Sequence, residues 1–96
     1  MLVKMTQVIK DTYDDTRASL KTIYINPKHV ITITEDLYTK SVNEANGPIL
    51  EGLSKNHSFS KININSGSQS RSITVVGSPE SVMKALKKNT RQLMKG

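Results

Sequence analysis

The tetrapeptide Asn26-Pro27-Lys28-His29 constrains the fold of this chain more than any other short segment, because it forces a turn between two stretches of strand-forming residues. Pro27 fixes its own φ and moves the preceding residue out of helical conformations. The Asn26 side chain can accept a hydrogen bond from the backbone that follows. Residues 20–25 before the turn and 30–34 after it are rich in β-branched side chains. The segment is therefore predicted to be a β-hairpin.

Each strand of this hairpin has an apolar face that must be buried against another part of the protein. Ile23 and Ile25 share one face of the first strand, and Ile31 and Ile33 share one face of the second. Because side chains alternate between the two sides of a strand, each pair is expected to point to a single side of the sheet.

Further strands are predicted on either side of the hairpin. Residues 2–10 and 71–76 have strand character, and residues 59–65 alternate cleanly, with Ile62 and Ile64 on one face. The polar residues 11–17 suit a connection between strands, and residues 66–70 suit a flexible turn. The last two strands are therefore predicted to form a second hairpin.

A helix is predicted to begin at Gly77-Ser78-Pro79-Glu80, the strongest boundary signal in the chain. Ser78 suits the N-cap, proline the first helical position, and glutamate the positive end of the helix dipole. Apolar residues follow at helical spacing and are expected to cover the sheet: Val82, Met83, Leu86, Leu93 and Met94.

Residues 37–56 are predicted to be a long loop or insert. Asn46-Gly47-Pro48 is a strong break, while residues 49–53 suit either one helical turn or a loop that packs its own apolar residues. Connections of this length tend to be functional or mobile.

These elements predict one domain, residues 1–96, of the α+β class: a small, mostly antiparallel sheet of about five strands with one C-terminal helix packed on one face. Of the 96 residues 35% are hydrophobic, and only four are aromatic, so the core is thin. Sharing an apolar face with a second copy is a common remedy, and a homo-oligomer is expected.

The segments "IYINPKHVITITED" and "SITVVGSPESVMKAL" resemble the FlbD-like family of flagellar and swarming motility proteins. In that family a strand runs into an Asn-Pro turn and a second strand, and a final strand leads into a C-terminal helix. The resemblance covers residues 21–36 and 72–86. The insert at 37–56 and the cationic extension after Leu86 depart from it. It implies the same fold and a part without catalytic residues.

Composition points to a reducing compartment and away from membranes. The chain has no cysteine, which excludes disulfides and a cysteine nucleophile, and cytoplasm is the expected location. Lys4 and Gln7 interrupt the first residues before a signal-peptide core could form, and no later apolar run is long enough to span a bilayer. Membrane insertion is not expected.

No pattern for catalysis, a metal or a cofactor is found, and the protein is predicted not to be an enzyme. Asp11, Asp14 and Asp15 lack the glycine and terminal glutamate of a calcium loop and suit a solvated turn. His29 and His57 have no metal-ligand spacing. The serines lie in no nucleophile motif, and no glycine-rich phosphate loop occurs.

The one surface with a clear physical use is the cationic side of the C-terminal helix. The net charge is +6, and residues 79–96 carry +4 of it, from five cations and Glu80. Closely spaced cations on a rigid helix can neutralise successive phosphates. The predicted contact residues for nucleic acid or another acidic partner are Lys84, Lys87, Lys88, Arg91 and Lys95.

Two functions are therefore weighed. The first is a small non-catalytic binding or regulatory module that contacts nucleic acid or another acidic partner through this helix. In such a module Tyr24, Tyr38 and Phe59 could form a stacking platform for bases, and the alternative is that they are core residues. The second is a homo-oligomeric structural or adaptor protein, in which the lysines form a solvated helix face and serve solubility alone.

Overall fold

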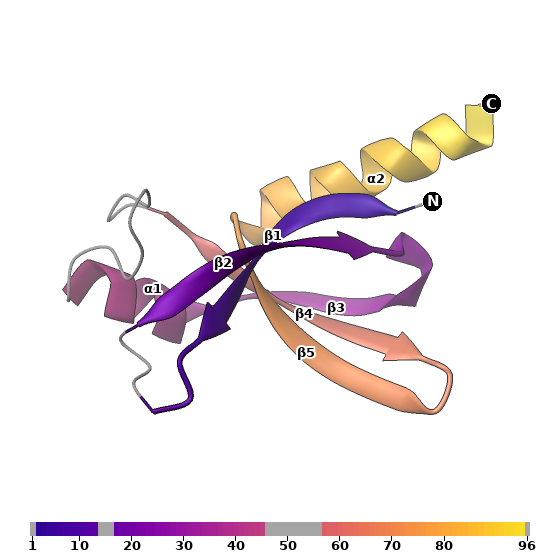
Figure 1. Cartoon of the computed structure of the whole chain (residues 1–96). Helices are drawn as coiled ribbons and strands as arrows, with labels where there is room; N and C mark the ends of the chain where they lie inside the picture. Colours follow the sequence, from indigo (N-terminus) through magenta and orange to yellow (C-terminus); the bar gives the residue numbers. More distant parts are fainter. Residues whose placement is uncertain (1, 14–16, 46–56, 96) are drawn as a thin grey trace.

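A computed structural model describes residues 2–13, 17–45 and 57–95, and these form a five-stranded antiparallel sheet with two α-helices (Figure 1). The α+β class, the five strands and the C-terminal helix are as predicted. The elements are β1 (Val3–Lys10), β2 (Ala18–Ile25), the 3₁₀ turn η1 (Pro27–His29), β3 (Val30–Glu35), α1 (Leu37–Ala45), β4 (Phe59–Ser66), β5 (Gln69–Val76) and α2 (Pro79–Lys95).

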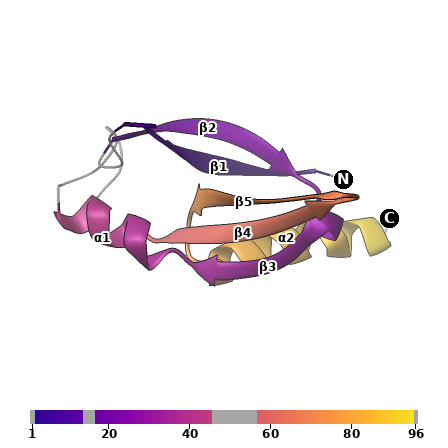
Figure 2. The same cartoon turned by 90° about the horizontal axis from the view of Figure 1, so that it is seen from below.

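The strands lie in the order β2-β1-β5-β4-β3. β1 and β2 form one hairpin and β4 and β5 another, each paired along its full length. The two hairpins are joined through a short pairing of β1 with β5, at Gln7–Val75 and Val8–Thr74. Figure 2 shows the result: the β1–β2 ribbon lies over the layer of β3, β4 and β5, so the sheet is strongly curled.

The hairpin predicted around Asn26-Pro27-Lys28-His29 is wrong in its pairing, although the turn is present. β2 pairs with β1 and β3 pairs with β4, at opposite edges of the sheet. The turn satisfies its own backbone groups: His29 N–H donates to Asn26 O at 3.0 Å, and Lys28 N–H donates to Asn26 Oδ1 at 3.0 Å. It therefore redirects the chain across the open side of the curled sheet instead of placing the two strands side by side.

The prediction that Ile31 and Ile33 share a face is also wrong. The register of β3 against β4 shifts between Val30 and Thr32, which marks a β-bulge. An extra residue reverses the alternation of side chains. Val30 and Ile33 consequently pack against the core, while Ile31 is 59% exposed.

The main core lies between the two layers of the curled sheet and is closed by α2. Val3 and Ile25 come from the β1–β2 ribbon, and Val82 and Leu86 come from α2. The β4–β5 hairpin supplies the remaining buried members, namely Ile62, Ile64, Ile73 and Val75.

α2 begins as the sequence predicts. Ser81 N–H donates to Ser78 Oγ at 3.2 Å, so Ser78 is the N-cap, and Gly77 before it has φ +125°. The helix contacts β1, β3 and β4. Val82 and Leu86 are buried as predicted, but Met83 is 46% exposed, because a residue next to Val82 on a helix points about 100° away from it. The side chains of Leu93 and Met94 lie outside the described part of the structure.

The predicted loop at 37–56 contains a helix, α1, over its first nine residues. Asp36 caps it by accepting from Thr39 N–H at 3.0 Å, and Asp36 N–H donates to Phe59 O at 2.9 Å. Thr39 and Asn43 are buried, which fixes α1 at the start of β4. Residues 46–56, including the apolar segment 49–53, lie outside the described residues.

Candidate functional site

The predicted cationic face of α2 is exposed where the structure describes it. Lys84, Lys87 and Lys88 are all exposed. They lie within about 100° of one another around the helix, and Lys84 is about 160° from the buried Val82. Packing of the apolar side against the core therefore turns these amines outward. The backbone of α2 continues to Lys95, and the side chains of Arg91 and Lys95 lie outside the described part of the structure.

Except for Glu80, which lies one helical turn before Lys84 on the same side of α2, acidic residues are distant from this face along the sequence. They occupy positions 11, 14, 15, 35, 36, 44, 51 and 80, and the segments 16–34, 52–79 and 81–96 contain none. Among the described acidic residues outside α2, Asp11 follows β1, Glu35 ends β3, Asp36 lies between β3 and α1, and Glu44 lies in α1. Figures 1 and 2 show these elements at one end of the molecule, and η1, the β4–β5 turn and the C-terminal half of α2 at the other.

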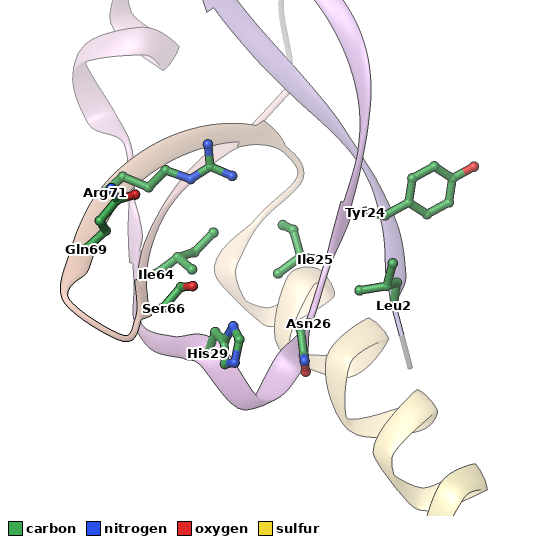
Figure 3. Close-up of a pocket in the computed structure, with 9 residues that line it drawn as sticks. All are labelled: Leu2, Tyr24, Ile25, Asn26, His29, Ile64, Ser66, Gln69 and Arg71. Atoms are coloured by element: carbon green, nitrogen blue, oxygen red, sulfur yellow. The ribbon is translucent and has the colours of Figure 1, made fainter.

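The end that carries η1 has a pocket of ≈ 370 Å³ between the two layers of the sheet, here called the end pocket (Figure 3). It lies where the β1–β2 ribbon and the β4–β5 hairpin diverge, beyond their short pairing. Its lining residues are Leu2, Tyr24, Ile25, Asn26, His29, Ile64, Ser66, Gln69 and Arg71.

The end pocket exists because the inner face of the β4–β5 hairpin changes from apolar to polar along its length. Ile73 and Val75 on β5 are buried, but Gln69 and Arg71, at the preceding positions of the same strand parity, are exposed. Arg71 pairs with Ile64 in the register of the two strands. The curled sheet therefore has an apolar interior with a polar, cationic mouth.

η1 forms one side of the pocket opening, and its last residue, His29, lines the pocket. The side-chain oxygen of Asn26 is held by Lys28 N–H, and Val30 N–H donates to Pro27 O, so the turn is fixed at both ends. His29, predicted to be a surface or turn histidine, is exposed and lines the pocket.

The three aromatic residues considered as a stacking platform do not share a surface. Phe59 is fully buried, as the alternative core role requires. Tyr24 ends β2 at the end pocket and is 58% exposed, while Tyr38 lies in α1 and is 56% exposed. Lys10 Nζ lies 4.9 Å from the centre of the Tyr38 ring. Of the three, Tyr24 alone lines the end pocket.

A polar cluster around Asp36 occupies the opposite end and has a structural role. Asp36 Oδ2 accepts from Thr39 Oγ1 at 2.9 Å and from Thr74 Oγ1 at 3.1 Å, which ties α1 to β5. Burial raises the pKa of the Asp36 carboxyl, but the hydrogen bonds from Thr39 and Thr74 and the positive charge of Lys10 outweigh it, so this pKa lies below its usual value.

The acidic and histidine residues considered for metal binding are not brought together where they are described. Asp11 Oδ1 accepts from Tyr13 N–H at 2.8 Å, the geometry of a local turn, and Asp14 and Asp15 lie outside the described residues. Within residues 2–13, 17–45 and 57–95, no group of three acidic, histidine or cysteine side chains could hold a metal ion.

The end pocket is the feature that sequence reasoning missed. Its signal was present at Arg71, which shares strand parity with Ile73 and Val75 and so belongs to the apolar face of β5. An arginine on that face indicates the place where the core ends. The contribution of η1 was not predictable in the same way, because it depends on β2 and β3 occupying opposite edges.

Comparison with family models, with curated proteins and with solved structures gives no match for this chain. The resemblance to the FlbD-like family accordingly stays a prediction. In the part of the chain that the structure describes, neither helix has the length and apolar character needed to cross a bilayer.

Proposed function

We propose that the protein is a small non-catalytic binding module that contacts nucleic acid through the cationic face of α2. The observation that carries this proposal is the separation of charge: exposed Lys84, Lys87 and Lys88 lie on a helix whose one acidic residue is Glu80, at its start.

The cationic face is held on a rigid support. Ser78 caps α2, and Val82 and Leu86 anchor it in the core. Lys84 and Lys88 are one helical turn apart, which places their stems about 6 Å apart along the axis. A row of regularly spaced cations suits a polymer of regularly spaced anions, and its binding free energy comes largely from released counterions.

The proposal is tested by fluorescence anisotropy with labelled single-stranded and duplex oligonucleotides at low salt. K84E/K88E is expected to weaken binding at least tenfold. K21E/K61E makes the same change of net charge at exposed positions of β2 and β4 and is the matched control, expected to bind as the unaltered protein does. Circular dichroism checks that α2 still forms, since K84E/K88E places three glutamates, at positions 80, 84 and 88, in two successive i,i+4 pairs.

Two outcomes would overturn the proposal: no binding at low salt, or equal loss in both double variants. A third arm adds polyglutamate as a competitor. If polyglutamate displaces the oligonucleotide at equal charge concentration, the helix binds acidic polymers in general, and an acidic protein partner replaces nucleic acid in the proposal.

A second candidate, a homo-oligomeric structural or adaptor protein, is favoured by the two edges of the sheet. β2 and β3 each have one strand neighbour among the described residues. Three large apolar side chains on these edge strands are at least two-fifths exposed: Leu20, Tyr24 and Ile31. Pairing of such edges between copies would cover them. Light scattering after size exclusion tests this candidate, and a strictly monomeric mass at high concentration would remove it.

A further inference from the structure

We propose that the end pocket holds one nucleotide of a single-stranded nucleic acid, with Arg71 and His29 at its phosphate and its base against Ile25 and Ile64. This inference rests on the proposed function and names the strand form and the second contact surface. Its basis is the composition of the pocket and its position at the end of the molecule where the C-terminal half of α2 lies.

The pocket combines an apolar floor with a polar rim. Ile25 and Ile64 are buried members of the main core, and their edges form the floor. A volume of ≈ 370 Å³ falls within the range of about 300–1,000 Å³ typical of small-molecule sites. An apolar floor suits the face of a base, which packs against aromatic or apolar side chains in base-binding pockets.

The rim has the charge that a phosphate requires. In Figure 3 the Arg71 side chain extends from β5 over the opening toward β2, and His29 lies on the other side, in η1. A guanidinium group donates two parallel hydrogen bonds to a phosphate. None of the nine lining residues is acidic, which disfavours a cationic ligand.

Neutral hydrogen-bonding groups complete the rim. Ser66 and Gln69 offer hydroxyl and amide groups that can both donate and accept, and Asn26, whose Oδ1 accepts from Lys28 N–H, offers its amide N–H groups. Groups of this kind suit the edge of a base, whereas a site for a simple inorganic anion would need donors alone. The pocket therefore fits a nucleotide better than it fits free phosphate.

Tyr24 stands at the outer edge of the pocket. Its ring is directed away from Arg71 in Figure 3, and the side chain is 58% exposed. A second base of the same strand, next to the one in the pocket, would stack on this ring. Leu2, also 58% exposed, lies beside it and extends the apolar surface.

The pocket requires a single strand because a paired and stacked base cannot enter it. Recognition of individual bases by small domains targets strands whose bases are free to turn outward. Figures 1 and 2 show the C-terminal half of α2 at the same end of the molecule as η1. A strand whose phosphates lie along the lysines of α2 can thus continue into the end pocket.

The test compares binding of a labelled single-stranded hexanucleotide by the unaltered protein, R71Q, Y24A and the control K61Q, which removes one exposed cation from the outer face of β4. R71Q and Y24A are each expected to weaken binding about tenfold, and K61Q less than twofold. Backbone amide shifts on titration should appear at residues 24–29 and 64–71 as well as in α2. A duplex of the same sequence should bind more weakly, and R71Q should not change its affinity beyond the effect of K61Q.

The outcomes separate this inference from the proposed function. Hexanucleotide binding that K84E/K88E abolishes but R71Q and Y24A leave unchanged would overturn the pocket inference and leave the proposed function standing. Absence of any oligonucleotide binding would overturn both. A free nucleoside monophosphate could bind the pocket as tightly as the hexanucleotide does, without competing with it. That result would mean that the pocket binds a small molecule and not a strand, and it would overturn the inference.

Discussion

Single residues hold the elements of this small domain together, and Asp36 is the clearest case. Its carboxylate caps α1 through Thr39 and reaches Thr74 on β5, so one side chain joins a helix to the sheet. The sequence contains the signal for this cap, an aspartate followed three residues later by threonine. The break at residues 46–48 nevertheless predicts a loop over residues 37–56, a prediction that does not include α1.

Replacing Asp36 tests this role and its pH dependence. Asp36→Ala is expected to lower the free energy of unfolding at pH 7 by about 2 kcal/mol, from the lost cap and the lost bond to Thr74. Asp36→Asn keeps a capping oxygen and should cost less. Both are measured by urea denaturation.

The lowered pKa of Asp36 gives the sign of the acid effect. Because the pKa is lower in the folded than in the unfolded protein, the contribution of Asp36 is complete above about pH 4 and is lost as the pH falls through the folded-state value. The unaltered protein should therefore lose more stability than Asp36→Asn as the pH falls from 5 to 3. Parallel curves for the two proteins would contradict the assignment.

Gly77 is the second residue on which the fold depends. Its φ of +125° lies in a region reserved for glycine, and an added Cβ would stand 3.1 Å from Ser81 Oγ. Its amide donates to Ser58 O and its carbonyl accepts from Ser60 Oγ, each at 2.8 Å, so the backbone has little freedom to adjust.

Gly77→Ala is accordingly expected to cost about 2–3 kcal/mol of stability. The control is Gly67→Ala in the β4–β5 turn, where φ is +67° and an added Cβ meets nothing within 4 Å. That change should cost about 1 kcal/mol. The melting temperatures of the two variants compare these losses of stability. A Gly67 variant that melts as low as the Gly77 variant would contradict the steric role of Gly77.

For the secondary-structure elements, the sequence predicts which segments form strands or helices far better than it predicts which strands pair. Strand alternation and the Ser78-Pro79-Glu80 signal are local properties, and β1, β2, β4, β5 and α2 follow from them. The partner of a strand is decided by the whole sheet. The turn at Asn26 was recognised, but nothing local could show that β2 would pair with β1 and β3 with β4 across a bulge.

α2 is an integral part of the core in this structure, and its two faces should respond differently to truncation. Leu86→Ala removes a buried side chain and is expected to cost about 2–4 kcal/mol, which lowers the melting temperature by about 10 °C or more. Met83→Ala, one turn earlier and 46% exposed, should change it by less than half as much. Equal effects would mean that α2 does not pack as described.

Across the molecule, most described acidic residues and the end pocket lie at opposite ends. The described acidic residues outside α2 lie at the end that carries α1, while the end pocket, η1 and the C-terminal half of α2 lie at the other. The sequence predicted the cationic helix from residue spacing. It did not predict the end pocket, because Arg71, His29 and Tyr24 come from three segments that only the curled sheet brings together.

The salt dependence of oligonucleotide binding tests this account most directly. A plot of log Kobs against log salt concentration for a single-stranded oligonucleotide should be steep and linear, and K84Q/K88Q should reduce its slope by about 1.4, or about 0.7 for each lost phosphate contact. The control K21Q/K61Q should leave the slope unchanged. A flat plot for the unaltered protein, or a slope that K84Q/K88Q does not alter, would contradict the assignment of α2 as the nucleic-acid contact.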